Sequence, residues 1–196
     1  MRRKRKAEGD KEANDARCHV RGVSPFDLVG KMSTVPDSSP TVSIRIAKAT
    51  DVPAIVSVVN AAFAIETFFQ GTRTDAKGVM EMMQKGEFLV AESASGGIVA
   101  TVYTELRGER GYFGMLAVEP SQQGSGLGRK MMEAAEGHCR SHGCKHMDID
   151  VVSLCPDNLS LYRKFGYFET GTKQFHPPPS REVGVECHLI IMSKAL

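Results

Sequence analysis

The sequence predicts a single α/β domain of the α+β kind, with helices and strands in the order βααβββαβαββ. Segments with an apolar residue at every second position alternate with segments whose apolar residues recur every three or four positions. Clusters rich in glycine separate these segments and predict turns. A length of 196 residues has room for one such domain and a tail.

The first 40 residues differ in composition from the rest of the chain. They mix Lys, Arg, Asp, Glu, Ser, Pro and Gly without an apolar period, so they cannot bury enough surface to offset the entropy of ordering. We therefore expect a disordered basic and polar tail over residues 1–40 and a folded domain over residues 41–196.

The folded domain begins with a strand and two helices. Val42–Ile46 alternates strictly between apolar and polar residues, which is typical of a half-buried strand. Thr50 or Asp51 can cap the helix that follows, and Pro53 lies in its first turn. Apolar residues over 52–63 recur at helical spacing, and a second helix is expected over residues 75–83.

The middle of the chain predicts an antiparallel meander of three strands. Residues 88–91, 98–104 and 112–118 have strand character and are separated by short glycine-containing turns. The remaining elements are expected as a helix from Leu127 that stops at Gly143, a strand over 146–152, a helix over 156–165 and strands over 167–172 and 186–192.

Composition and charge exclude several classes of protein. No run approaches the roughly 18 apolar residues of a membrane span, so we expect no membrane partner. The formal net charge is only +2, and much of the basic excess lies in the first six residues. We expect a solvated terminus there and no nucleic-acid partner, although a nuclear signal fits the same hexamer. The four acidic residues that follow it disfavour a transit peptide.

The five cysteines favour an intracellular, reducing location, and we expect a cytoplasmic protein. Their number is odd, and no Cys-x-x-Cys pair occurs. The run from His138 to His146 contains three histidines and two cysteines, with His138 and His142 on one helix face. Because Gly143 should end that helix and scatter the other candidates, we expect no metal.

The most informative segment runs from Met115 to Lys130, where a strand leads through a glycine turn into a helix. Such a turn directs unpaired N–H groups and the positive end of the helix dipole to one place, which suits a pyrophosphate. A P-loop is absent, and the glycines at 124, 126 and 128 do not fit the dinucleotide fingerprint. A mere tight turn is the alternative interpretation.

Two motifs resemble those of the GNAT superfamily of N-acetyltransferases. Gln123, Gly126 and Gly128 are similar to its acyl-CoA signature, and Asn158 to Tyr167 is similar to its helix ending in Leu-Tyr-x-x-x-Gly-Phe/Tyr. The element order is also the order of that fold, so the resemblance covers about four-fifths of the chain. It implies a mixed, mostly antiparallel sheet of six to seven strands, flanked by four helices and splayed between the fourth and fifth strands.

The resemblance also implies a cofactor site for acetyl-CoA. The pantetheine arm would lie in the splayed gap, held by backbone groups of Leu116, Ala117 and Val118. The pyrophosphate would bind the N–H groups of the turn and helix start, namely Gln123, Gly124, Ser125, Gly126, Leu127, Gly128 and Arg129. Arg129 could add a cationic contact.

Two residues near the end of the chain receive roles from the same resemblance. Asn158 would hydrogen-bond the pantetheine or thioester, and Tyr162 would lie near the sulfur. A phenol with an ordinary pKa near 10 can protonate a departing thiolate, so Tyr162 is our candidate general acid. A structural role is the alternative for both: a helix-start residue for Asn158 and a core aromatic for Tyr162.

The general base must be an acidic residue or a histidine, because an aliphatic amine is protonated at neutral pH. Glu66, Glu105 and His176 are the candidates. We favour Glu66, because its segment places a carboxylate and Arg73 beside aromatic residues, as a pocket requires. Arg73 could then hold a carboxylate of the acceptor.

These observations predict an enzyme that transfers acetyl from acetyl-CoA to a primary amine, in direct attack within a ternary complex. We expect a small-molecule acceptor, because the loops at 64–75 and 172–185 offer no acidic groove for a basic peptide tail. A protein or peptide N-acetyltransferase and a non-catalytic acyl-CoA sensor remain alternatives. A homodimer is compatible with the sequence.

Overall fold

The computed structural model describes residues 42–66, 69–177 and 181–196, and for residues 181–183 it describes the backbone alone. The tail expected over residues 1–40, with its basic hexamer, lies outside the described residues. Within the described ranges, no helix is long and apolar enough to cross a membrane.

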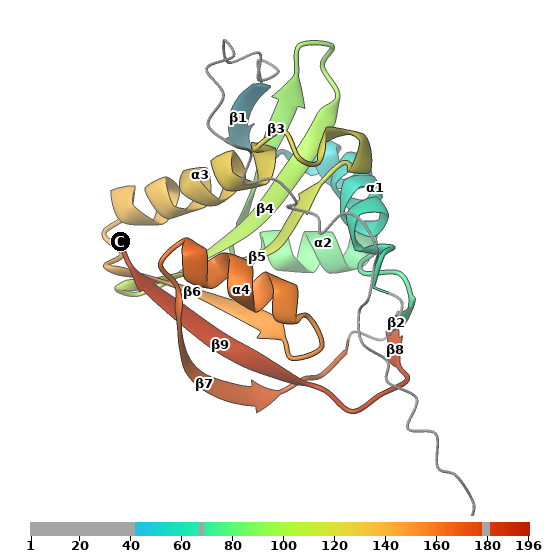
Figure 1. The fold of residues 1–196 in the computed structure, drawn as a ribbon. Coiled ribbons are helices and arrows are strands. Elements are labelled where there is room, and N and C mark those ends of the chain that lie inside the picture. The colour runs from blue at the N-terminus through green and yellow to red at the C-terminus, as the bar shows by residue number, and fades with distance from the viewer. Residues whose placement is uncertain (1–41, 67–68, 178–180) are drawn as a thin grey trace, which may run out of the picture.

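A seven-stranded sheet in the order β1-β3-β4-β5-β6-β9-β7 forms the centre of the described part (Figure 1). Its neighbouring strands are antiparallel except β5 and β6, which are parallel. The strands are β1 (Val42–Ile46), β3 (Glu87–Ser93), β4 (Ile98–Arg107), β5 (Arg110–Val118), β6 (His146–Val152), β7 (Phe168–Gln174) and β9 (His188–Ala195).

The helices cover both faces of this sheet. α1 (Val52–Phe63) and α2 (Ala76–Met83) lie on one face, and α3 (Leu127–Ser141) and α4 (Pro156–Lys164) lie on the other (Figure 1). Two short 3-10 turns, Ala49–Asp51 and Pro120–Gln122, precede α1 and α3. The four predicted helices and the predicted meander of β3, β4 and β5 are confirmed.

Each face of the sheet has its own hydrophobic core. Phe113 belongs to the core under α3 and α4, together with Met131 and Leu159. Tyr112 lies next to it in β5 but packs with the core under α1 and α2. This follows from the period of two in a strand, which sends neighbouring side chains to opposite faces. The strand β5 therefore contributes side chains to both halves of the molecule.

The two helices on the α1 face begin differently. The Asp75 carboxylate accepts a hydrogen bond from the Gly78 N–H at 2.7 Å and caps α2 as a typical N-cap residue does. Asp51 precedes α1 but makes no such bond. Its carboxylate instead accepts from the Lys48 N–H at 2.7 Å and from Arg45 at 2.6 Å, which ties the helix start to β1.

A small ribbon that we did not predict joins two distant loops. β2 (Phe69–Gly71) pairs with β8 (Arg181–Val183) in a separate two-stranded sheet. The rings of Phe69 and Phe175 lie 5.4 Å apart beside it. The two loops expected to form the acceptor site, residues 64–75 and 172–185, are thus connected by backbone pairing.

Candidate functional site

The parallel strands β5 and β6 separate after three paired residues. Their register runs from Arg110 opposite His146 to Tyr112 opposite Asp148 and then stops. A cavity of about 310 Å³ lies beyond this point, lined by residues 113–118 of β5 and 149–152 of β6. The predicted splay between the fourth and fifth strands of the main sheet is confirmed.

A bulge shapes the β5 side of this gap. Thr101 of β4 lies opposite Ala117 and Tyr103 lies opposite Gly114, so two residues of β5, 115 and 116, oppose one residue of β4 at this step. Met115 within the bulge has a φ of 51°, which a residue with a side chain rarely adopts. Because a bulge leaves its extra residue out of the ladder, backbone groups at Met115 and Leu116 can serve a ligand in the cavity.

The glycine turn follows directly after the cavity wall. Gly124 and Gly126 have φ values of 77° and 80°, and α3 begins at Leu127. The first hydrogen bond of the helix joins the Lys130 N–H to the Gly126 carbonyl, and no side chain caps the helix. The N–H groups of residues 127–129 therefore face outward from the helix end. A Cβ at Gly126 would meet no atom within 4 Å, so the turn is open there.

The side chains of Gln123 and Arg129 in this segment contact neighbouring protein groups. The Gln123 amide donates to the Val118 carbonyl at 3.1 Å and fastens the turn to the end of β5. Arg129 forms an ion pair with Glu133 at 2.7 Å, and both side chains are more than half exposed. Leu116, Ala117, Val118 and Asn158 line the cavity, whereas residues 123–129 lie outside its lining.

Tyr162 lines the cavity from α4. Its ring packs 6.0 Å from that of Phe113 and 5.9 Å from that of Tyr167. Within the described part of the chain, its hydroxyl has no hydrogen-bond partner. Burial raises the pKa of Tyr162 above the ordinary value of a phenol, so the hydroxyl keeps its proton at neutral pH.

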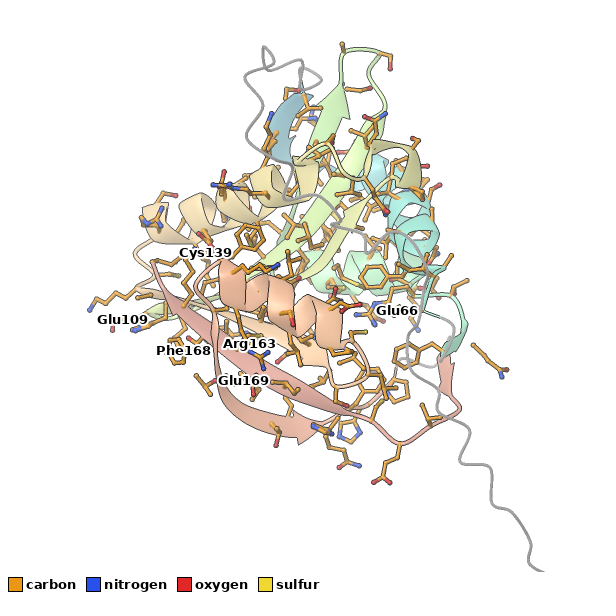
Figure 2. All side chains as sticks on the ribbon, viewed as in Figure 1. Glu66, Glu109, Cys139, Arg163, Phe168 and Glu169 are labelled. Atoms are coloured by element: carbon orange, nitrogen blue, oxygen red, sulfur yellow. The ribbon has the colours of Figure 1, made fainter. Side chains whose placement is uncertain are left out.

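Charged residues line the cavity on the side of α1 and α2. Glu66 follows the end of α1 (Figure 2), and Arg73 lies with its guanidinium 4.7 Å from the ring of Phe63. Asp150 of β6 completes this group. The cavity thus passes through the sheet, with Tyr162 and Asn158 on one face and the charges of Glu66, Arg73 and Asp150 on the other.

Of the three candidate bases, Glu66 alone lines the cavity. Glu105 accepts two hydrogen bonds from Arg107, at 2.9 and 3.0 Å, and these bonds lower the pKa of Glu105. His176 is exposed and lies outside the lining.

Sequence reasoning missed Asp150 and Tyr112. The Asp150 carboxylate lies 2.8 Å from the Lys173 ammonium, and Tyr112 lines the same cavity near it. The alternation within residues 146–152 places Asp148 and Asp150 on one face of β6, which is a visible signal. Which of the two reaches the gap depends on where the strands separate.

The histidines and cysteines of residues 138–146, which we considered as metal ligands, make other contacts in the structure. His138 lies 2.9 Å from Glu87 and 4.5 Å, between ring centroids, from His142. Cys139 and Cys144 are buried in the core. Among the described residues, no group of three or more His, Cys, Asp or Glu side chains is placed to hold a metal ion.

Comparison with known proteins finds similarity to one family of enzymes. Residues 84–169 match the model of the acetyltransferase (GNAT) domain family. Mycothiol acetyltransferase of Propionibacterium freudenreichii is 28% identical over 136 residues, which are 65% of this chain and 43% of that protein. The chain therefore spans less than half the length of this curated relative.

Solved structures share the fold at low sequence identity. The ribosomal-protein-S18-alanine N-acetyltransferase of Escherichia coli is 18% identical, with a TM-score of 0.64 over 79% of this chain and 94% of that chain. A proposed acetyltransferase from Salmonella typhimurium, solved with its cofactor acetyl-CoA, is 20% identical, with a TM-score of 0.59 over 80% of this chain and 94% of that chain. Residues 84–169 thus match a GNAT acetyltransferase domain model, and the described chain has the GNAT-like fold that the motifs predicted.

Proposed function

We propose that this protein is an N-acetyltransferase that transfers acetyl from acetyl-CoA to the primary amine of a small molecule. The observation that carries this proposal is the cavity between β5 and β6. It passes through the sheet, with Tyr162 at one face and the charged residues Glu66, Arg73 and Asp150 at the other. Two reactants can enter such a cavity from opposite faces and meet in the gap. A direct transfer in a ternary complex uses this proximity.

The residues present fit acetyl-CoA. The outward N–H groups of the α3 start suit a pyrophosphate, and the positive φ values of the turn keep those groups together. We propose that Leu116, Ala117, Val118 and Asn158 hold the pantetheine and that residues 123–129 hold the pyrophosphate. Arg129 can join them by leaving Glu133, since an exposed ion pair contributes little. The bound thioester supplies the acetyl group.

We propose Tyr162 as the general acid and Glu66 as the general base. Tyr162 has a protonated hydroxyl without a partner among the described residues, and it lines the gap where the thiol would leave. Glu66 lines the opposite side, where the amine would enter. The carboxylate takes a proton from the ammonium, and the phenol gives one to the thiolate.

The shape of the acceptor side supports a small molecule. The ribbon of β2 and β8 connects the loops on either side, and Phe69 and Phe175 pack beside it. An extended peptide needs an open groove, whereas a connected pair of loops encloses a compact ligand. The relatives include one named for a small thiol and one named for a ribosomal protein, so the loops of this chain are the better guide.

The first test measures thiol release from acetyl-CoA with pooled amino acids, polyamines, aminoglycosides, arylamines and peptides. We expect release that depends on one of the small-molecule pools. Release with peptides alone would favour a protein acetyltransferase. If no pool gives release while acetyl-CoA still raises the melting temperature, the domain is an acyl-CoA sensor.

A further inference from the structure

Asp150 is a carboxylate on the cavity wall that the proposed chemistry does not use. It lies in β6, two residues beyond the last pair between β5 and β6. Its side chain is 14% exposed and lies on the charged side of the cavity. A carboxylate this far removed from water is costly unless cations or hydrogen-bond donors surround it.

Two neighbours meet that requirement in part. The Lys173 ammonium of β7 lies 2.8 Å from Oδ2 of Asp150. Tyr112 lies near the same carboxylate, since burial and then the charge of Asp150 raise the pKa of Tyr112. The Arg107 guanidinium stacks 4.1 Å from the centre of the Tyr112 ring and fixes its position. A carboxylate has about four lone-pair positions, so these two contacts leave capacity for a further donor.

The contact with Lys173 also shows that the Asp150 carboxylate binds a primary ammonium group. Its side chain ends in a primary alkylammonium group, and it approaches Asp150 from the surface strand β7 with 45% of its side chain exposed. Lys173 does not line the cavity, whereas Asp150 and Tyr112 do. The cavity side of the same carboxylate can therefore receive a second primary ammonium group.

We propose that Asp150 and the Tyr112 hydroxyl form the subsite that binds the ammonium group of the acceptor. The acceptor is then an alkylamine, which is a cation at neutral pH, and not an arylamine, which is neutral there and lacks the charge attraction to a carboxylate. This inference rests on the proposed function, and it gives the two cavity carboxylates different roles. Asp150 binds and orients the nitrogen, and Glu66 removes its proton.

Asp148 provides a matched control on the same strand. It shares the face of Asp150, but Arg110 and Ser193 surround it and it lies outside the cavity lining. The substitutions Asp150→Asn and Asp148→Asn each remove one charge from β6 and preserve the size of the side chain. Each substitution also removes one ion pair of β6, with Lys173 or with Arg110, so loss of an ion pair alone would affect both variants alike.

The first experiment measures binding without turnover. The full chain, saturated with CoA, is titrated with n-butylammonium chloride and with 1-butanol at constant ionic strength, and the melting temperature is followed. We expect butylammonium to bind the wild type and Asp148→Asn, and to bind Asp150→Asn roughly tenfold more weakly, as for a lost charged hydrogen bond. Butanol should not distinguish the variants. Equal binding of butylammonium to all three, or none to the wild type, would overturn the proposal.

The second experiment uses an alkylamine that supports thiol release. In Asp150→Asn we expect the KM for the amine to rise about tenfold, while the KM for acetyl-CoA and kcat stay within about twofold. An unchanged amine KM would refute the subsite and leave the acetyltransferase proposal intact. Absence of turnover in the wild type, with butylammonium still bound through Asp150, would refute the proposed function instead.

Discussion

At the scale of single residues, Tyr162 combines a packed ring with a hydroxyl that has no hydrogen-bond partner among the described residues. A polar group on the wall of an interior cavity normally finds a partner in the protein or in a ligand. The residue is thus held in place by Phe113 and Tyr167 while its oxygen stays available to the cavity. Packing fixes the position and leaves the hydroxyl proton available for the proposed transfer to the thiolate.

Replacing Tyr162 by Phe should lower kcat by about 10² to 10⁴, the range of general acid catalysis. Because the raised pKa of Tyr162 keeps it protonated, the wild type should show no alkaline loss of activity from this group below about pH 10. Thiol release between pH 6 and 10 tests both statements. Acetyl-CoA should raise the melting temperature of the variant as it does that of the wild type. Full activity of the variant would remove Tyr162 from the mechanism.

Glu66 should show its role in the pH dependence of kcat/KM. A general base acts only when it is ionised, so the wild-type kcat/KM should fall at acidic pH. In Glu66→Gln we expect a rate lower by about 10² and the loss of that acidic limb. Glu105→Gln is the control, because Glu105 lies outside the cavity lining. An acidic limb that persists unchanged in Glu66→Gln would point to another base.

At the scale of elements, the start of α3 depends on a backbone conformation that a side chain opposes. Gly126 has a φ of 80° directly before the helix, and its surroundings are open. Glycine adopts this conformation without the strain that a Cβ introduces. The openness also means that a Cβ there would project into the space proposed for the pyrophosphate.

Gly126→Ala should lower the free energy of unfolding by about 1 to 2 kcal/mol and raise the KM for acetyl-CoA. Gly137→Ala is the matched control within α3, because its Cβ would also meet nothing within 4 Å and its backbone is helical. That control should stabilise the protein by up to about 1 kcal/mol. Urea unfolding and thiol release measure the two effects. Equal behaviour of the two variants would argue against a special role for the turn.

At the scale of the whole molecule, a buried contact connects α3 to the C-terminal half. Glu136 of α3 is 5% exposed and accepts a hydrogen bond from the Tyr167 hydroxyl at 2.8 Å. Lys194 of β9 lies 2.8 Å from the same carboxylate. These contacts bind together the two halves that separate at the gap between β5 and β6.

Glu136→Leu should lower the free energy of unfolding by about 1 to 3 kcal/mol, because the Tyr167 hydroxyl loses its partner in a buried site. Lys194 can turn to solvent, so its loss of a partner adds little. The double variant Glu136→Leu with Tyr167→Phe should cost less than the sum of the two single changes. Urea midpoints test this. Strict additivity would show that the two residues are not coupled.

The sequence by itself determined the local elements and the glycine turn before α3. Helices and strands follow from the spacing of apolar residues, and the glycine turn between β5 and α3 follows from backbone conformations that few other residues adopt. Tyr162 was named from the resemblance of residues 158–167 to a family motif, and Glu66 from the Arg73 and aromatic residues of its segment. Both line the cavity, and their catalytic roles remain predictions.

The tertiary structure alone decided where the gap begins and which charges face it. The separation of β5 and β6 after Tyr112 depends on two strands that are distant in sequence, and it brings Asp150 rather than Asp148 to the cavity. The pairing of β2 with β8 likewise joins segments more than 100 residues apart. Local periodicity carries no information about such non-local pairing, because it reports only which face of an element is buried.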